Sequence, residues 1–265
     1  MTLAQDLTLA VDAARAAGDL LLDHWADRDA LAIDAKRPGD YVSQADHRAE
    51  ALLRDRLLGG PPGDGWLGEE SDARPGTRRW IVDPLDGTTN FLRGIGHWAV
   101  SVALEDAGRL VLGVVHDPLR AETFSAMAGG GLRLNDAGLL PAQPPGFDAA
   151  LWGTGMPFGD MPHIDDHAAD LARMLPGTAG VRRMGAAALD LAYVAAGRLD
   201  GFWERRLRPW DIAAGLVLLR EAGIRVEGWT PDERPEETGT VIAAPPALFD
   251  TFAGRLRAPG QSSRA

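Results

Sequence analysis

The sequence predicts a mixed α/β protein, α+β in its first half and α/β in its second. Two helical patterns open the chain and a series of strand-like runs follows them. Beyond a stretch rich in proline and glycine at 136–146, short strands alternate with helices. Boundaries between compact units fall in such stretches, so we expect two subdomains, 1–137 and 138–265.

The first two helices are predicted by apolar residues that recur every three or four positions. One extends from Leu3 to Trp25, and the other begins at Ser43. Asp46 follows Ser43 by three residues, which fits a capping box, so Asp46 has a sufficient structural explanation.

Strands dominate the rest of the first half. The expected runs are residues 80–82, 97–104, 110–116 and 122–126. A turn at 106–108 joins the middle pair into an antiparallel hairpin. The second half is expected to hold two strands and two helices, at 151–154, near 181, at 165–175 and at 187–196.

The stretch W-I-V-D-P-L-D-G-T-T-N-F, residues 80–91, concentrates the groups that could carry chemistry. Its apolar start predicts a buried strand, which we expect to stop at Pro84 because proline lacks an N–H group. Asp83 and Asp86 flank the bend, and residues 87–89 can open a helix that binds an anion. Asp-Pro and Asp-Gly are also common surface turns. The uninterrupted order of strand, acids, glycine and hydroxyls nevertheless favours a metal-bridged phosphate.

Composition restricts which kinds of molecule or ion this protein is expected to bind. The formal net charge of −11 argues against a nucleic acid as the main partner and suits a divalent cation better. The chain has no cysteine, so a metal site must use oxygen or imidazole ligands. His163 and His167 are spaced as on one helix face but lack the glutamate of a zinc motif. No secretory signal or membrane-length apolar run is evident, so we expect a cytoplasmic protein without a membrane partner.

The string D-P-L-D-G-T-T-N resembles the D-P-x-D-G-T-x-N signature of the inositol monophosphatase family of metal-dependent phosphatases. Four further elements resemble that family in the same order: residues 40–46, 68–71, 185–204 and 209–215. The likeness extends from Lys36 to about Ala244. It implies a layered αβαβα sandwich of the sugar phosphatase type and a homodimer.

The resemblance also implies a role for each group. Two or three Mg²⁺ ions, with Mn²⁺ as a substitute, would be held by Glu69, Asp83, the Leu85 carbonyl, Asp86 and Asp211. The residues implied to orient and deprotonate a water are Glu69, Thr88 and Asp46. The residues implied to bind the substrate are Asp86, Gly87, Thr88, Thr89, Gly185, Ala186, Ala187 and Glu204. Asp211 could equally be a helix N-cap.

The implied reaction is hydrolysis of a small polyol phosphate, with inositol monophosphate as the first candidate, and lithium would inhibit it. Alternatives are histidinol phosphate, another sugar or nucleotide phosphate, or a non-catalytic regulatory protein on the same fold. Ala186 replaces a more usual threonine, and three arginines at 205, 206 and 208 make the loop before Trp210 basic. We expect Glu204 at the rim of the site, accepting hydrogen bonds from substrate hydroxyls; the alternative is a surface ion pair with those arginines.

Overall fold

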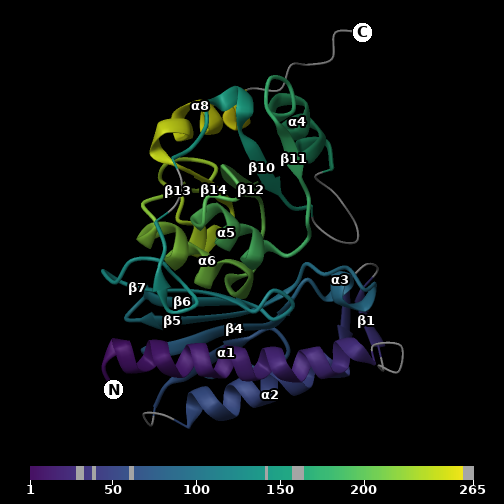
Figure 1. Cartoon of the computed structure of the whole chain (residues 1–265), viewed down its shortest axis with the longest axis vertical. Coiled ribbons are helices and arrows are strands. Elements are labelled where there is room, and N and C mark those ends of the chain that lie inside the picture. Colours follow the sequence, from purple (N-terminus) through teal and green to yellow (C-terminus); the bar gives the residue numbers. More distant parts are fainter. Residues whose placement is uncertain (28–32, 38–39, 60–62, 141–142, 157–163, 259–265) are drawn as a thin grey trace.

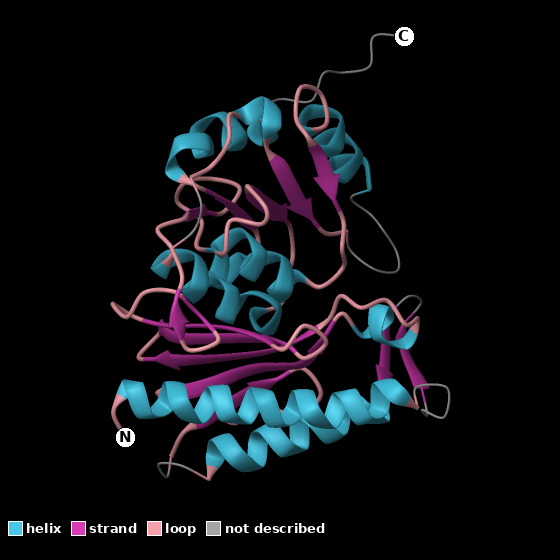
Figure 2. Cartoon of the chain, in the orientation of Figure 1, coloured by secondary structure: helices cyan, strands magenta, loops and turns pink. Residues whose placement is uncertain are grey.

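Five layers stack along the long axis of the molecule, as Figures 1 and 2 show. The computed structural model describes residues 1–27, 33–37, 40–59, 63–140, 143–156 and 164–258, with the backbone alone for 33–37 and 40–42. From the N-terminal end, the layers are a helix pair, a sheet, a second helix pair, a second sheet and an outer helix pair. The αβαβα sandwich implied by the family resemblance is therefore confirmed.

The first helix pair is α1 (Leu3–Ala26) and α2 (Gln44–Leu58). Between them in the chain lies the antiparallel ribbon of β1 (Ile33–Arg37) and β2 (Asp40–Ser43). The strands of the first sheet, in chain order, are β3 (Gly65–Gly68), β4 (Arg78–Asp86), β5 (Ala99–Asp106), β6 (Arg109–Asp117), β7 (Glu122–Met127), β8 (Arg133–Leu134) and β9 (Ala137–Gly138). Neighbours in sequence are neighbours in the sheet, and every pair is antiparallel except β3 with β4. The short helix α3 (Thr88–Leu92) follows β4 directly.

The second half builds the other sheet and its helices. Its elements are η2 (Phe147–Ala149), β10 (Leu151–Thr154), α4 (Ile164–Met174), β11 (Gly180–Arg182), α5 (Ala187–Ala195), β12 (Gly201–Glu204), α6 (Pro209–Glu221), β13 (Arg225–Glu227), α7 (Pro235–Thr238), β14 (Val241–Ala244) and α8 (Pro246–Arg257). The strand order is β11-β10-β12-β14-β13, with β10 parallel to both of its neighbours. The division at 137/138 stays a prediction.

Three apolar cores separate the layers. One lies between α1, α2 and the first sheet and includes Trp66, Trp80 and Trp98. A second surrounds α5 and α6 between the two sheets, and a third joins the second sheet to α4 and α8. Among the described helices, none is both long and apolar enough to cross a membrane.

Both predicted N-terminal helices and the hairpin are present, and the capping box is confirmed. The Ser43 hydroxyl accepts a hydrogen bond from the Ala45 N–H group, and Asp46 accepts one from the Ser43 N–H group at 2.9 Å. His163 lies outside the described residues. His167 lies in the first turn of α4, where it is buried.

The expectation that the strand stops at Pro84 is wrong, because β4 continues to Asp86. Asp83 pairs with Ser101 and Asp86 with Ala99, so three steps along β4 match two along β5. Such a bulge leaves one residue out of the ladder, which is why a proline without an N–H group is tolerated there. Since Ser101 and Ala99 face the same side of the sheet, the bulge turns the two aspartates to one side as well.

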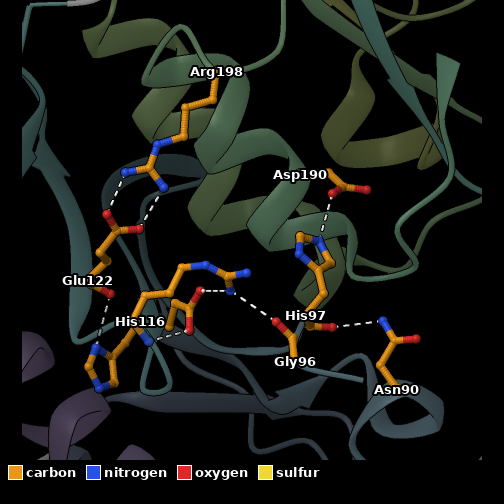
Figure 3. Close-up of polar contacts among 9 residues, drawn as sticks. Asn90, Gly96, His97, His116, Glu122, Asp190 and Arg198 are labelled. Atoms are coloured by element: carbon orange, nitrogen blue, oxygen red, sulfur yellow. Dashed lines mark hydrogen bonds and ion pairs between the residues drawn. The ribbon is translucent and has the colours of Figure 1, made fainter. Parts of the chain in front are cut away.

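Polar contacts fix the start of α5 against the end of β4. The His97 ring donates from Nε2 to Asp190 Oδ1 at 2.9 Å, with both residues buried. Asn90 donates to the His97 carbonyl at 2.7 Å and to the Met184 carbonyl at 2.8 Å. Figure 3 shows His97 turned toward Asp190, and Asn90 toward His97. Two of these bonds link the segment between β4 and β5 to α5 and to the residues just before it.

Removing the His97 ring should destabilise the protein, because Asp190 would keep a buried carboxylate without its donor. We expect His97→Ala to lower the free energy of unfolding by about 3 kcal/mol. Urea denaturation followed by circular dichroism measures this change. The matched control is His47→Ala at an exposed position of α2, which should change it by less than about 0.5 kcal/mol. Equal effects of the two substitutions would contradict the role of the His97–Asp190 bond.

Candidate functional site

The end of β4 places two acids beside a helix start. Asp83 and Asp86 are 2 % and 8 % exposed, and Asp83 accepts a hydrogen bond from the Leu85 N–H group at 2.9 Å. Gly87 caps α3 with a φ of 95°, a conformation that favours glycine. A Cβ at Gly87 would also lie 3.2 Å from the Ala186 Cβ, so this turn touches the second half directly.

Thr88 begins α3 and is bonded to the groups on either side of it. Its hydroxyl lies 3.0 Å from Asp46 Oδ1 and 3.0 Å from the Leu85 carbonyl. Burial raises the pKa of Asp46, and its bonds to Ser43 and Thr88 oppose that shift. One oxygen of Asp46 therefore caps α2 while the other reaches Thr88. The structural explanation of Asp46 and the implied functional one are compatible.

Glu69 reaches the site through β3, a strand that the sequence did not predict. In the parallel pair, Gly68 lies opposite Val82, so the next residues, Glu69 and Asp83, are neighbours. Burial raises the pKa of Asp83 well above its usual range, and repulsion from Glu69, Asp86 and Asp211 raises it further. These carboxylates therefore lie close enough to repel one another.

Asp86, at the end of β4, and Asp211, in α6, are the remaining acids of this group. Burial, followed by repulsion from Asp211, raises the pKa of Asp86, whose Oδ2 accepts a hydrogen bond from the Ala188 N–H group at 2.7 Å. The suggestion that Asp211 is an N-cap is wrong, because Arg208 occupies that position of α6. Asp211 is the third residue of the helix and accepts a hydrogen bond from the Arg208 N–H group at 2.6 Å.

A pocket of about 90 Å³ opens beside these acids. It is lined by Asp86, Gly155, Met156, Arg183, Gly185, Ala186, Ala187, Asp190, Glu204, Leu207 and Asp211. Predicted residues from both halves therefore meet at one place, although 118 positions separate Asp86 from Glu204 in the sequence. Thr89 is the second residue of α3 and is half-buried, and it is not part of this lining.

Glu204 lies deeper than the rim position that we expected. It ends β12 and is only 7 % exposed, and burial followed by repulsion from Asp211 and Asp190 raises its pKa well above the usual range. Gly155 leaves no room for a Cβ beside this carboxylate. The alternative of a surface pair does not fit a buried side chain. Arg205, its neighbour, instead binds Asp170 and stacks over the Trp229 ring.

The donor set fits a hard divalent cation, because it consists of carboxylate and carbonyl oxygens. Among the described residues, no three acidic or histidine side chains are already arranged as a finished metal site. Main-chain N–H groups hold Asp83, Asp86 and Asp211 in place. The excess of negative charge around Asp83 is the feature that a cation would relieve.

Five residues of the pocket were absent from the expected set: Gly155, Met156, Arg183, Asp190 and Leu207. Gly155 directly follows β10, and a glycine at a strand end can mark a close approach. Arg183 stands two residues before Gly185, and Asp190 lies one turn inside α5. The side chains of Asp40 and Val42, part of the family motif, lie outside the described residues.

The chain is similar to known proteins over nearly its whole length. Residues 2–259 match the inositol monophosphatase family. The inositol-1-monophosphatase of Rhizobium meliloti (strain 1021) is 46 % identical over 243 residues, which cover 89 % of this chain and 90 % of the relative. The Nus factor SuhB of Escherichia coli (strain K12) is 39 % identical over 254 residues, covering 95 % of each chain.

Solved structures that are similar to this chain carry the same names. The extragenic suppressor protein suhB from Bartonella henselae superposes with a TM-score of 0.91 at 40 % identity, covering 94 % of this chain and 97 % of that one. The inositol monophosphatase from Anabaena (Nostoc) sp. PCC 7120 gives a TM-score of 0.85 at 31 % identity, with 99 % and 100 % covered. The chain therefore belongs to the inositol monophosphatase family, a family of phosphatases.

Proposed function

We propose that this protein is a Mg²⁺-dependent phosphomonoesterase that hydrolyses a small polyol phosphate, with inositol monophosphate as the first substrate to test. The observation that carries the proposal is the group of buried, mutually repelling carboxylates next to the Thr88–Asp46 hydrogen bond. Acids gathered in this way need a cation, and Thr88 supplies a hydroxyl beside them. Membership of a phosphatase family supports the same reaction.

The metal ligands that we propose all offer oxygen atoms: Glu69, Asp83, the Leu85 carbonyl, Asp86 and Asp211. They would hold two or three Mg²⁺ ions, or Mn²⁺ in their place. When bound, such ions neutralise the charge of a phosphate dianion and acidify a water molecule. The chain itself has no cysteine and no G-x-S-x-G motif, so direct attack by water is the simplest route.

The residues around the ions would orient the attacking water. The Thr88 hydroxyl donates to Asp46 or to the Leu85 carbonyl, which leaves its oxygen lone pairs to accept a hydrogen bond from that water. Glu69, beside Asp83 in the strand register, would accept the proton that the water releases. Gly87, Thr88 and Thr89 would bind the phosphate oxygens through N–H and hydroxyl groups.

The alcohol side of the substrate would occupy the pocket between Gly185, Ala186, Ala187 and Glu204. A buried carboxylate such as Glu204 accepts hydrogen bonds from hydroxyl groups, which favours a polyol over an aryl alcohol. Histidinol phosphate and other sugar or nucleotide phosphates are the alternatives within this class. A phosphate-release screen over these monoesters, with and without Mg²⁺, tests the proposal and ranks the substrates.

A regulatory role is the second candidate, because several relatives are named Nus factors. A purely regulatory protein would be free to lose its metal ligands, whereas every implied ligand is present in this sequence. We therefore favour catalysis, with any regulatory role additional to it. A homodimer and a cytoplasmic location stay predictions.

Replacing a single metal ligand should abolish turnover without unfolding the protein. We expect Asp83→Asn and Asp211→Asn each to lower kcat by at least about 10³-fold, since several kcal/mol of charge stabilisation is lost. Without metal, Asp83→Asn should also melt no lower than the wild type, because it removes a buried charge that its neighbours repel. Phosphate-release kinetics and thermal melts in EDTA measure both effects. Unimpaired turnover of either variant, judged beside the exposed control Asp55→Asn, would refute the metal assignment.

Lithium should inhibit the reaction, because a small hard cation competes for an Mg²⁺ site made of oxygen ligands. We expect inhibition to be strongest when Mg²⁺ is limiting. Initial rates over a grid of lithium and Mg²⁺ concentrations measure it, with sodium at equal ionic strength as the control. Full activity at high lithium and limiting Mg²⁺ would count against the prediction.

Glu204→Ala should impair hydrolysis of a polyol phosphate far more than that of an aryl phosphate. The lost hydrogen bonds to substrate hydroxyls should cost about 1 to 3 kcal/mol of transition-state stabilisation, or about 5- to 150-fold in kcat/KM. Measuring kcat/KM for inositol monophosphate and p-nitrophenyl phosphate decides the question. Glu237→Ala, at an exposed ion pair, is the control. Equal losses for both substrates would show that Glu204 does not set specificity.

A further inference from the structure

Helix α2 presents a row of three polar side chains toward the site, each one turn from the next: Asp46, Glu50 and Arg54. Asp46 accepts the hydrogen bond of Thr88. Glu50 accepts one from the Glu70 N–H group at 2.7 Å, and Arg54 donates to the Ser71 hydroxyl at 3.4 Å. One helix therefore contacts both Thr88 and the loop that carries Glu69.

Of these three residues, Glu50 is the one whose carboxylate is not explained by a contribution to stability. Its side chain is 3 % exposed, and its Oε1 atom is buried without a hydrogen-bond partner among the described residues. Burying an unsatisfied carboxylate oxygen is unfavourable, and an apolar side chain of similar size would avoid that cost. A group kept at such a cost calls for a reason other than packing.

The Glu50 carboxylate lies against the backbone of Gly68, the residue just before Glu69. A Cβ at Gly68 would lie 2.6 Å from Glu50 Oε1 and 2.6 Å from Trp66 Nε1, so only glycine lets these groups approach. On the far side of Glu69, the Glu70 N–H group is bonded to Glu50 Oε2. The carboxylate thus contacts the residue before Glu69 and the residue after it.

We propose that Glu50 is a positioning residue, which holds Glu69 in the orientation that binds a divalent cation. The inference rests on the proposed function, in which Glu69 is a metal ligand. Partners of metal ligands fix ligand geometry, and replacing them typically weakens metal affinity or activity by about 10- to 100-fold. Glu50 acts through the main chain of the Gly68–Glu70 segment and does not touch the substrate.

A merely structural role predicts the opposite result. If Glu50 only stabilised the loop, its replacement would lower the melting temperature and leave metal affinity unchanged. If it positions Glu69, an apolar residue of similar size should leave the melting temperature nearly unchanged, because removal of the orphan oxygen offsets the lost bond to the Glu70 N–H group, while metal affinity falls.

The experiment compares Glu50→Leu, Glu50→Gln and Arg54→Ala with the wild type. Mn²⁺ affinity is measured from the EPR signal of the free ion, Mg²⁺ affinity by competition, and the melting temperature in EDTA. We expect Glu50→Leu to raise the Kd for both ions at least about tenfold, and Glu50→Gln, which keeps an acceptor for Glu70, to stay within about threefold. Arg54 contacts the same loop at Ser71, beyond Glu70, so Arg54→Ala should bind both ions with the same Kd as the wild type.

An unchanged Kd in Glu50→Leu overturns the proposal, as does a glutamine variant that binds as weakly as the leucine one. Should the leucine variant not fold, Glu50→Asp replaces it, because one methylene fewer withdraws the acceptor from Glu70; weaker binding is expected and equal binding overturns the proposal. Failure of the proposed function is separate, since it would appear as a wild type that binds Mn²⁺ yet releases no phosphate from any monoester.

Discussion

Repulsion among buried carboxylates is the constraint on which the arrangement of this protein depends. Asp83 and Asp86 come from β4 and Asp211 from α6, far apart in sequence. Burial raises the pKa of both β4 acids, and repulsion from Asp211 raises it further. The fold tolerates the group because main-chain N–H groups bond the acids. A bulge at Pro84 brings Asp83 and Asp86 to one side of β4, and the first turn of α6 adds Asp211.

The same acids lie at the starts of α5 and α6, the helices that an apolar core packs between the sheets. Asp86, at the end of the first sheet, accepts hydrogen bonds from the first turn of α5, where the helix dipole favours negative charge. Asp211 lies in the first turn of α6, at an equivalent place. The middle helix layer thus directs two helix starts toward one cluster of acids. The His97–Asp190 bond keeps α5 at that position.

The features that could be predicted from the sequence are those that depend on residues close together in the chain. Periodicity indicated α1 and α2, the Ser43–Asp46 spacing indicated the capping box, and the family motif indicated the acids of β4. It did not predict β3 or the bulge, because both depend on pairing with another strand. Pro84 marks a strand end by local rules, yet the partner strand β5 accommodates it. Glu50 and Gly155 escaped notice for the same reason, since their contacts come from distant segments.

Buried acids in this protein differ in their hydrogen-bond partners, and the difference locates the site. Asp6 is bonded to Arg78, Asp117 to Arg120, and Asp170 to Arg173 and Arg205. These pairs are satisfied within the protein and serve the fold. Among the described residues, the hydrogen bonds that reach Asp83 and Asp86 come only from main-chain N–H groups, and Glu50 keeps an orphan oxygen. Within the described part of the chain, Asp83, Asp86 and Glu50 form no ion pair with an arginine, and they lie in one region, where their charge suits a ligand that supplies positive charge.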